Sequence, residues 1–198
     1  MASLAHAEDS VLVPPDDTVA GASQALWSQR WWEWAGSFPM EMSPIADKTG
    51  DLCTNGQSGD VWFLAGTYGT KRAVRTCHVP QGKYLFFPLI NYVAYPPYGH
   101  EVSCMQVMTD AARLTNAPGG LVLAVDGVRF TEMAQHRQLS PACFDLGAKA
   151  LPARRMYPAA ANGYYAMLKP LSPGRHTVEF GGSLPSMYQA VTYQLIVE

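Results

Sequence analysis

Repeated strand and turn patterns in the last third of the chain constrain the fold more than any other feature. Strand patterns cover residues 163–169, 175–180 and 188–197, and turn residues separate them at 172–174 and 181–185. In the last segment, apolar side chains occupy every second position, as in a strand with one buried face. Short strands joined by turns instead of crossover helices predict an antiparallel β-sheet protein.

The middle of the chain continues this pattern. Further strands are expected at 61–65, 72–79, 84–91, 121–125 and 128–130. Asp126-Gly127 predicts a two-residue hairpin, since both turn positions need positive φ. Pro88 cannot donate a ladder hydrogen bond, so it predicts either an edge position or a bulge. The stretch 131–162 has no clear period and is expected to be a long loop with short elements.

Two helices are expected, at 22–35 and 103–116, and the first is rich in tryptophan. Trp27, Trp31 and Trp34 share one face of that helix, whereas Trp32 points away from them. The stripe is expected to pack across a sheet, and Trp32 is a candidate for lining a ligand groove. The predicted fold is therefore mainly β, an antiparallel β-sandwich or jelly-roll-like domain with two flanking helices.

Four well-separated cysteines indicate disulfides and an oxidising compartment. Three pairings are possible for Cys53, Cys77, Cys104 and Cys143. Sequential pairing, Cys53–Cys77 and Cys104–Cys143, is favoured because it closes modest loops flanked by turn residues. A structural zinc site is disfavoured because no two of the cysteines are closely spaced.

The N-terminus points to export. Ala5-His6-Ala7 has the A-x-A form of a signal-peptidase site, although no basic and apolar leader precedes it. Residues 1–7 are therefore interpreted as a signal-peptide remnant at the start of the chain, and residues 8–198 as one β-rich domain. The expected location is secreted or periplasmic.

Charge and hydropathy limit the partners. The formal net charge is −2 with 15% charged residues, which favours neither nucleic acid nor an anionic membrane surface. The apolar runs are too short to span a bilayer, so no membrane insertion is expected. No nucleotide, cofactor or metal motif is present, so neither a cofactor nor a metal is expected. The oligomeric state stays open.

Five motifs are distinctive: the tryptophan cluster 27–34, the segments Val61-Trp62-Phe63-Leu64-Ala65-Gly66 and Arg75-Thr76-Cys77-His78-Val79-Pro80, the segment 82–88, and the closing stretch 165–177. Together they resemble those of an uncharacterised family of secreted bacterial proteins. The resemblance covers most of the chain. It implies export, a cysteine framework and one compact domain, and it implies no reaction.

An aromatic loop is the best candidate for a ligand site. Residues 91–101 contain three tyrosines, two stiffening prolines, a histidine and a carboxylate. Rigid aromatic faces beside hydrogen-bonding groups suit a sugar ring or another flat, partly apolar ligand. The candidate ligand-binding residues are Asn91, Tyr92, Tyr95, Tyr98, Tyr164 and Tyr165, and Tyr157 and Asn162 are further candidates for a second wall. The alternative is that the tyrosines cover a sheet edge.

Two further classes of function stay open. An enzyme acting on polysaccharide needs two carboxylates, and Glu101 is the first choice because it adjoins the aromatic loop. The other candidates are Asp47, Asp51, Asp60, Glu132 and Asp145. A lyase would instead pair Tyr98 with His100. The candidate catalytic residues are therefore Glu101 for a hydrolase and His100 for a lyase. The third class is a non-catalytic envelope or interaction protein that uses the tryptophan helix as an interface.

The remaining histidines divide by position. His78 and His176 lie in expected strands, where structural hydrogen bonds are the usual outcome. His100 and His136 lie in loops and are freer to act.

Overall fold

The computed structural model describes residues 10–150 and 152–198, except the side chains of residues 70 and 71. The proposed signal-peptide remnant, residues 1–7, lies outside the described residues.

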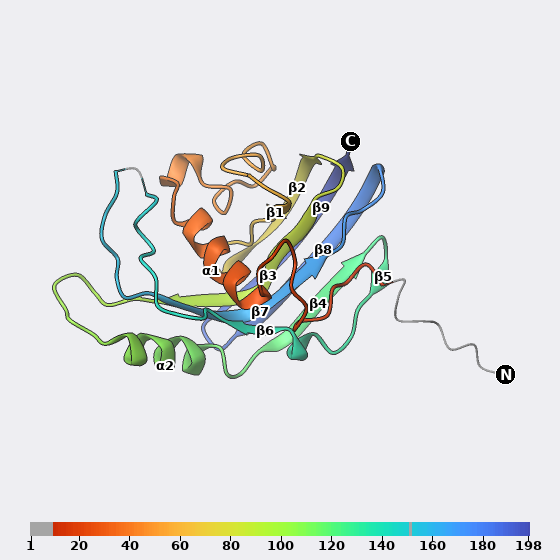
Figure 1. Cartoon of the computed structure of the whole chain (residues 1–198). Coiled ribbons are helices and arrows are strands. Elements are labelled where there is room, and N and C mark those ends of the chain that lie inside the picture. The colour runs from red at the N-terminus through yellow and green to blue at the C-terminus, as the bar shows by residue number, and fades with distance from the viewer. Residues whose placement is uncertain (1–9, 151) are drawn as a thin grey trace.

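Two β-sheets pack face to face, as the strand patterns predict (Figure 1). The four-stranded sheet has the order β1 (Val61–Phe63), β3 (Tyr84–Ala94), β7 (Ala160–Leu168), β6 (Arg137–Leu139). The five-stranded sheet has the order β2 (Thr70–Val79), β9 (Met187–Val197), β8 (Gly174–Leu184), β4 (Gly119–Val125), β5 (Val128–Arg129). Leucine, valine and aromatic side chains from both sheets form the core between them. The β-sandwich prediction is confirmed.

The sheets are not wholly antiparallel. β1 pairs with β3 in parallel, and β2 pairs with β9 in parallel. The chain leaves β1 for the other sheet, forms β2 there, and returns to form β3. Strands that become neighbours after such an excursion can run in the same direction. The other pairings are antiparallel, including the β4–β5 hairpin predicted from Asp126-Gly127, where both residues have positive φ.

Pro88 lies at a bulge in a central strand. β3 pairs with β1 on one side and β7 on the other, and its register with β7 shifts between Pro88 and Ile90. The expected bulge is confirmed and the alternative edge position is wrong. The Gln189 side chain, from the opposite sheet, donates hydrogen bonds of 2.8 Å to the carbonyl oxygens of Pro88 and Leu89. The bulge therefore helps to connect the two sheets.

Helix α1 (Gln24–Ala35) covers the outer face of the four-stranded sheet. Trp27, Trp31 and Trp34 are buried there, and their indole N–H groups donate to backbone carbonyl oxygens. The expectation that this stripe packs across a sheet is confirmed. Because the stripe is buried within the molecule, it does not form an exposed interface, and the observation behind the envelope or interaction alternative disappears.

Helix α2 (Cys104–Leu114) begins where the sequence predicts, with the Ser103 hydroxyl accepting from the Gln106 backbone N–H at 3.2 Å. The region 131–162 contains β6 and a short 3-10 helix, η3 (Met133–Gln135), and a second short 3-10 helix, η2 (Met40–Met42), follows α1. β7 starts at Ala160, three residues before the expected strand.

The bend expected at Gly181-Gly182 and Pro185 forms only at Pro185, because β8 continues through both glycines to Leu184. A Cβ on Gly182 would lie 2.9 Å from Leu121 Cδ2 and 3.2 Å from Ile90 Cβ. The glycine therefore permits close packing between the sheets and marks no turn. The turn lies at Pro185-Ser186, between β8 and β9.

Arg75 on β2 is 1% exposed and holds three segments of backbone together. Its guanidinium donates to the carbonyl oxygens of Ile45, Asp47, Ala65 and Gly66, and to the Tyr193 hydroxyl. These acceptors satisfy a buried charge that would otherwise be costly. The loop after η2 and the segment after β1 are thereby fixed beside the sandwich.

Both favoured disulfides are present. Cys53 is bonded to Cys77, and Cys104 to Cys143. Among residues 10–150 and 152–198, none of the helices is long and apolar enough to cross a membrane.

Candidate functional site

β3 and β7 extend beyond the five-stranded sheet as a two-stranded ribbon (Figure 1). Helix α2 covers one face of this ribbon, where Val107 and Ala111 pack against Ala94 and Ala160. The segment after β6 covers the other face, where Phe144 and Leu146 pack against Ala159, Ala161 and neighbours. The end of the ribbon is therefore supported on both sides, and the loops that leave it start from fixed positions.

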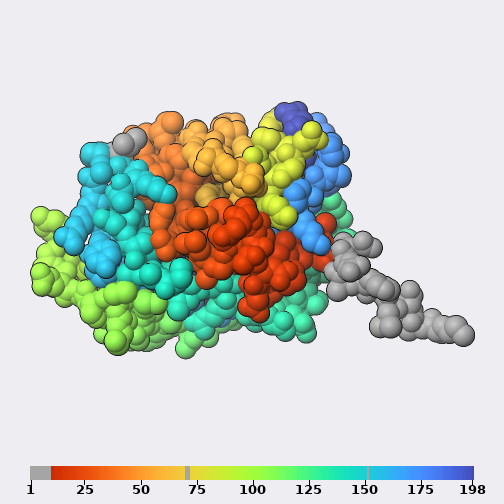
Figure 2. All heavy atoms as spheres, in the orientation of Figure 1, coloured from red at the N-terminus to blue at the C-terminus, as the bar shows by residue number. Residues whose placement is uncertain are grey.

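Two of these loops form a groove of about 900 Å³, which we call the tyrosine groove. Residues 95–102 line one side and residues 154–158 the other. Figure 2 shows the two segments at the same end of the molecule. Tyr98 is fully exposed, and Tyr95 and Tyr157 are 47% and 46% exposed. Three phenol rings from two loops thus meet at one open groove.

The first loop is stiffened at both ends. Pro96 and Pro97 restrict its backbone, and the His100 backbone N–H donates to the Pro97 carbonyl oxygen at 3.1 Å. The Cys104–Cys143 disulfide then ties the start of α2 to the segment after β6. Aromatic side chains on such a backbone lose little conformational entropy when a ligand binds.

The second loop is held by the Asp145 carboxylate. It accepts hydrogen bonds from the backbone N–H groups of Gly147 at 3.0 Å and Met156 at 2.8 Å. The Arg154 backbone N–H donates to the Gly147 carbonyl oxygen, and Lys149 forms a 2.8 Å ion pair with Glu33 of α1. These contacts keep the second loop opposite the aromatic loop.

Two guanidinium groups stand beside the tyrosines. Arg154 and Arg155 are exposed and line the groove, and the Arg155 guanidinium carbon lies 5.8 Å from the centre of the Tyr157 ring. Within the described part of the chain, no hydrogen bond or ion pair joins either guanidinium to a carboxylate. Glu101 is the one acidic residue among those that line the groove.

The structure divides the candidate ligand-binding residues into two sets. Tyr95 and Tyr98 line the groove with His100, Glu101 and the additional candidate Tyr157. Tyr92 lies on β3 and is half-buried. Asn91, Tyr164 and Tyr165 are buried and do not line the groove, so their assignment as ligand contacts is withdrawn. Asn162 is buried as well and accepts from Thr115 and Arg137.

The burial of the adjacent pair Tyr164 and Tyr165 has a simple cause. Successive side chains of a strand point to opposite faces, and both faces of β7 are covered, by the second sheet on one side and by α1 on the other. The Tyr165 hydroxyl accepts from Asn91 Nδ2 at 3.1 Å and Trp32 Nε1 at 3.2 Å. Burial raises the pKa of Tyr165 well above its ordinary value, against these two hydrogen bonds. This tyrosine is a structural residue.

A second hollow of about 540 Å³ adjoins the tyrosine groove, and we call it the Trp32 hollow. Trp32, Phe38, Met40, Tyr68 and Leu146 line it, and Arg154 lines both hollows. The expectation that Trp32 lines a ligand groove fits this position, since its ring faces a hollow while its indole N–H reaches Tyr165.

The carboxylates proposed for glycoside hydrolysis do not gather in the groove. Of the six candidates, Glu101 alone lines it. Asp145 is engaged by backbone N–H groups, as is Asp47, which accepts from Thr49 and Leu52. Hydrolysis with a carboxylate pair needs the two groups about 5–9 Å apart across the scissile bond. The lining of the groove does not supply that pair.

The candidates for lyase chemistry are on the groove but are not oriented by neighbours. Within the described residues, no hydrogen bond or ion pair engages the side chains of Tyr98, His100 or Glu101. A general base is usually oriented by a further polar group. The arrangement thus favours ligand contact over proton transfer.

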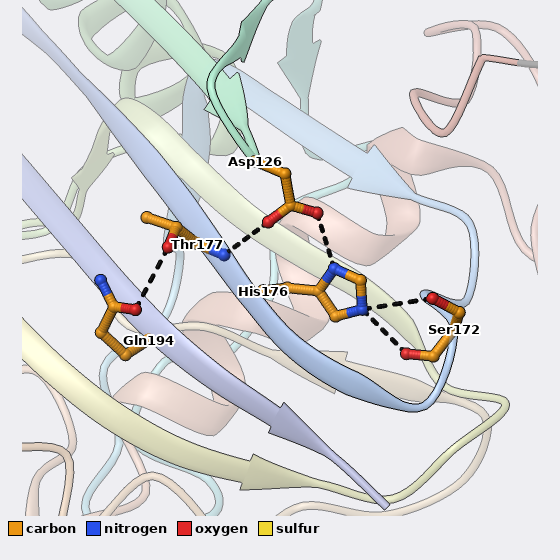
Figure 3. Close-up of polar contacts among 5 residues, drawn as sticks. All are labelled: Asp126, Ser172, His176, Thr177 and Gln194. Carbon is orange, nitrogen blue, oxygen red and sulfur yellow. Dashed lines mark hydrogen bonds and ion pairs between the residues drawn. The ribbon is translucent and has the colours of Figure 1, made fainter.

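His176, Asp126 and Ser172 form a cluster that resembles a hydrolase triad (Figure 3). His176 Nδ1 lies 2.6 Å from Asp126 Oδ2, and Nε2 lies 3.4 Å from Ser172 Oγ. However, Nε2 is closer, 2.8 Å, to the Ser172 carbonyl oxygen, which can only accept a hydrogen bond. An acceptor at each nitrogen favours the imidazolium, which has no lone pair with which to activate the serine.

The electrostatics agree with this interpretation. Burial opposes charging of the ring, but hydrogen bonds to Asp126 and to the Ser172 carbonyl raise the pKa of His176 above its ordinary value. Burial also opposes charging of Asp126, but the His176 contact and the Thr177 backbone N–H lower the pKa of Asp126. The cluster connects the β4–β5 turn to the start of β8 and is structural, as expected for His176.

His78 is hydrogen-bonded, and His136 is buried. His78 Nδ1 lies 2.7 Å from Glu198 Oε1, which fits the expected structural role. His136, expected in an accessible loop, is instead 7% exposed beside β6. Burial lowers its pKa, although Asp16 opposes this shift.

Sequence reasoning missed Arg154 and Arg155. Their signal was an Arg-Arg pair within a proline-containing irregular segment of a weakly charged chain. The pair became informative only when the loop was placed opposite the tyrosines.

Comparisons with known proteins identify no relative. No family model matches the chain, and no curated protein matches it. A solved structure described as "Structure of PbICP-C in complex with falcipain-2" matches at 9% identity with a TM-score of 0.31, covering 71% of this chain and 100% of that one. A likeness this weak carries no functional argument.

Proposed function

We propose that this protein is a secreted or periplasmic β-sandwich protein that binds a carbohydrate or another small ligand in the tyrosine groove. The observation that carries the proposal is the meeting of Tyr95, Tyr98 and Tyr157, from two loops far apart in the sequence, around one groove of about 900 Å³. That volume lies in the range of small-molecule sites.

The chemistry of the groove supports a sugar-like ligand. A pyranose ring has an apolar face, which a phenol ring covers well, and a rim of hydroxyl groups, which need hydrogen-bonding partners. The groove combines the exposed tyrosines with His100, Glu101 and two arginines. These rings are half-exposed or fully exposed, so much of their apolar surface is in water and a ligand can bury it.

Binding is supported over catalysis. Glu101 is the sole carboxylate among the lining residues, and both nitrogens of the His176 ring face acceptors rather than a group to activate. Export is supported by the two disulfides, which persist in oxidising compartments. The resemblance to a secreted bacterial family agrees with that location.

Tyrosine variants measured against a glycan array and a small-molecule thermal-shift panel test the proposal. Each of Tyr95→Ala, Tyr98→Ala and Tyr157→Ala should weaken binding of the ligand so found by about tenfold, since each removes one stacking face. Tyr188→Ala is the matched control, because Tyr188 is a half-exposed tyrosine on β9 outside the groove. Binding that survives all three groove substitutions would show that the ligand site lies elsewhere.

A further inference from the structure

We infer that the ligand is an acidic oligosaccharide, a chain of sugar units bearing carboxylate or sulfate groups, which lies across the tyrosine groove and the Trp32 hollow and contacts Arg154 and Arg155. This inference rests on the proposed function and adds the charge and the length of the ligand.

The charge of the ligand follows from the state of the arginines. Arg113 lies 3.5 Å from Asp110, and Arg137 donates to Asn116 and Asn162, so these two arginines have polar partners within the protein. Arg154 and Arg155 pair with no carboxylate of the described residues and stand at the edge of a groove. A guanidinium binds a carboxylate or a sulfate through paired hydrogen bonds, which makes an oxyanion the fitting partner.

The position of the arginines suits a sugar acid better than a free anion. The Arg155 guanidinium carbon is 5.8 Å from the centre of the Tyr157 ring. The guanidinium lies over one face of this ring, so a sugar ring stacked on the opposite face or beside it would carry an acidic substituent within reach of the cation. A small inorganic anion would use the arginines and leave the three tyrosine faces exposed.

General electrostatic attraction does not explain such binding, since the whole chain has a formal net charge of −2. Anions are not concentrated by the protein as a whole. Preference for an acidic ligand would therefore arise in the groove, where two arginines and one glutamate meet.

The length of the ligand follows from Arg154, which lines both hollows. Together they offer about 900 Å³ and about 540 Å³, more than one sugar unit occupies, and aromatic side chains line both. The backbone of the dividing segment is fixed by Asp145 and by the Lys149–Glu33 ion pair. A chain that passes Arg154 reaches Tyr68, which is 57% exposed.

Isothermal titration calorimetry with four probes tests the inference: an oligogalacturonate trimer and hexamer, a neutral galacto-oligosaccharide hexamer, and a sulfated galactan hexamer. At least one acidic hexamer should bind about tenfold or more tightly than the neutral hexamer, and the difference should shrink at high salt. Whichever of the two acidic hexamers binds more tightly identifies carboxylate or sulfate as the recognised group.

The double variant Arg154→Met/Arg155→Met should reduce acidic hexamer binding to the level of the neutral one. Arg129→Met/Arg175→Met is the matched control, since it removes the same charge from exposed positions outside the groove. Tyr68→Ala should weaken hexamer binding and leave trimer binding unchanged, which tests the use of the Trp32 hollow.

The outcomes separate the two proposals. Equal binding of acidic and neutral hexamers, abolished by the tyrosine variants, would overturn the acidic ligand and leave the proposed function standing. Equal binding of trimer and hexamer would overturn the extended ligand. If neither acidic hexamer binds and the tyrosine variants leave every ligand found on the array unaffected, both proposals are wrong.

Discussion

Arg75 contributes to stability through hydrogen bonds that only a guanidinium can make. It is buried, and its N–H groups are satisfied by four carbonyl oxygens and one hydroxyl. Arg75→Met fills a similar volume but leaves these acceptors without a donor. We expect the free energy of unfolding, measured with urea, to fall by about 3 kcal/mol.

Arg72→Met is the control for this substitution. Arg72 is exposed and takes no part in the buried hydrogen bonds of Arg75.

 Arg72 lies three residues before Arg75 and on the opposite, solvent-facing side of β2. Its substitution should therefore change the free energy of unfolding by less than about 0.5 kcal/mol. Equal losses in the two variants would contradict the role assigned to the Arg75 hydrogen bonds.

The His176–Asp126 pair should make stability depend on pH. The pKa of His176 is raised above its ordinary 6.5, so its stabilising contribution is complete below that pH and is lost as pH rises through the raised pKa. The pKa of Asp126 is lowered from 3.8, so its contribution is present above that pH and is lost as pH falls through the lowered pKa. The pair therefore stabilises the fold most between pH 3.8 and pH 6.5.

Thermal melts of the wild type and of His176→Gln at several pH values measure this effect. At pH 6 the variant should melt about 2 °C lower, and the difference should narrow as pH rises. Burial lowers the pKa of His136, so this residue changes the pH dependence of stability in the opposite direction. Because His136 is present in both proteins, its effect cancels in the difference between their melting temperatures. A constant difference in melting temperature between His176→Gln and the wild type across the pH range would rule out the linkage.

At the level of single residues, the sequence predicted the aromatic loop but not the full site. Three tyrosines and two prolines within a few positions are a local pattern, and Tyr95 and Tyr98 do line the groove. Asn91, Tyr164 and Tyr165 look equally suitable in the sequence, yet they are buried. Which face of a strand is covered depends on elements distant in the chain, so composition alone could not separate these residues.

The two disulfides lie in different parts of the fold and should differ in their effect on the groove. Cys104–Cys143 joins α2 to the segment that follows β6, close to both groove loops, whereas Cys53–Cys77 ties a loop to β2. The closed loops span 39 and 24 residues. Either removal should lower the free energy of unfolding by about 3 to 4 kcal/mol.

Cys104→Ser/Cys143→Ser should in addition weaken ligand binding several-fold, because the end of the aromatic loop that leads into α2 is then less firmly held. Cys53→Ser/Cys77→Ser is the control, with a comparable loss in urea stability and unchanged affinity by calorimetry. If both double variants weaken binding equally, the disulfide near α2 has no particular role in positioning the groove.

At the level of elements, local patterns predicted both helices and the β4–β5 hairpin. Ser103 caps α2, and Asp126-Gly127 forms the turn, because these features depend on neighbouring residues. Of the bend predicted at Gly181-Gly182 and Pro185, the glycine part was wrong because a glycine can serve a turn or close packing, and here Gly182 lies against Ile90 of the other sheet. Sequence alone does not distinguish these two uses.

For the whole molecule, the sandwich could be predicted from alternating strands, but the pairing of its strands could not. β2 and β9 are parallel neighbours although more than a hundred residues separate them in the chain. The tyrosine groove has the same origin, since residues 95–102 and 154–158 meet only because β3 pairs with β7. Long-range pairing leaves no local pattern, and it decides where the site forms.

The most direct measurement is a crystal structure of the protein with the best-binding glycan from the array. We predict ligand density between residues 95–102 and 154–158, with a sugar ring against Tyr98 or Tyr157 and an acidic group facing Arg154 or Arg155. Ligand density confined to another hollow, such as the one of about 420 Å³ on the five-stranded sheet near Gly120 and Gly181, with the tyrosine groove left open, would contradict the account.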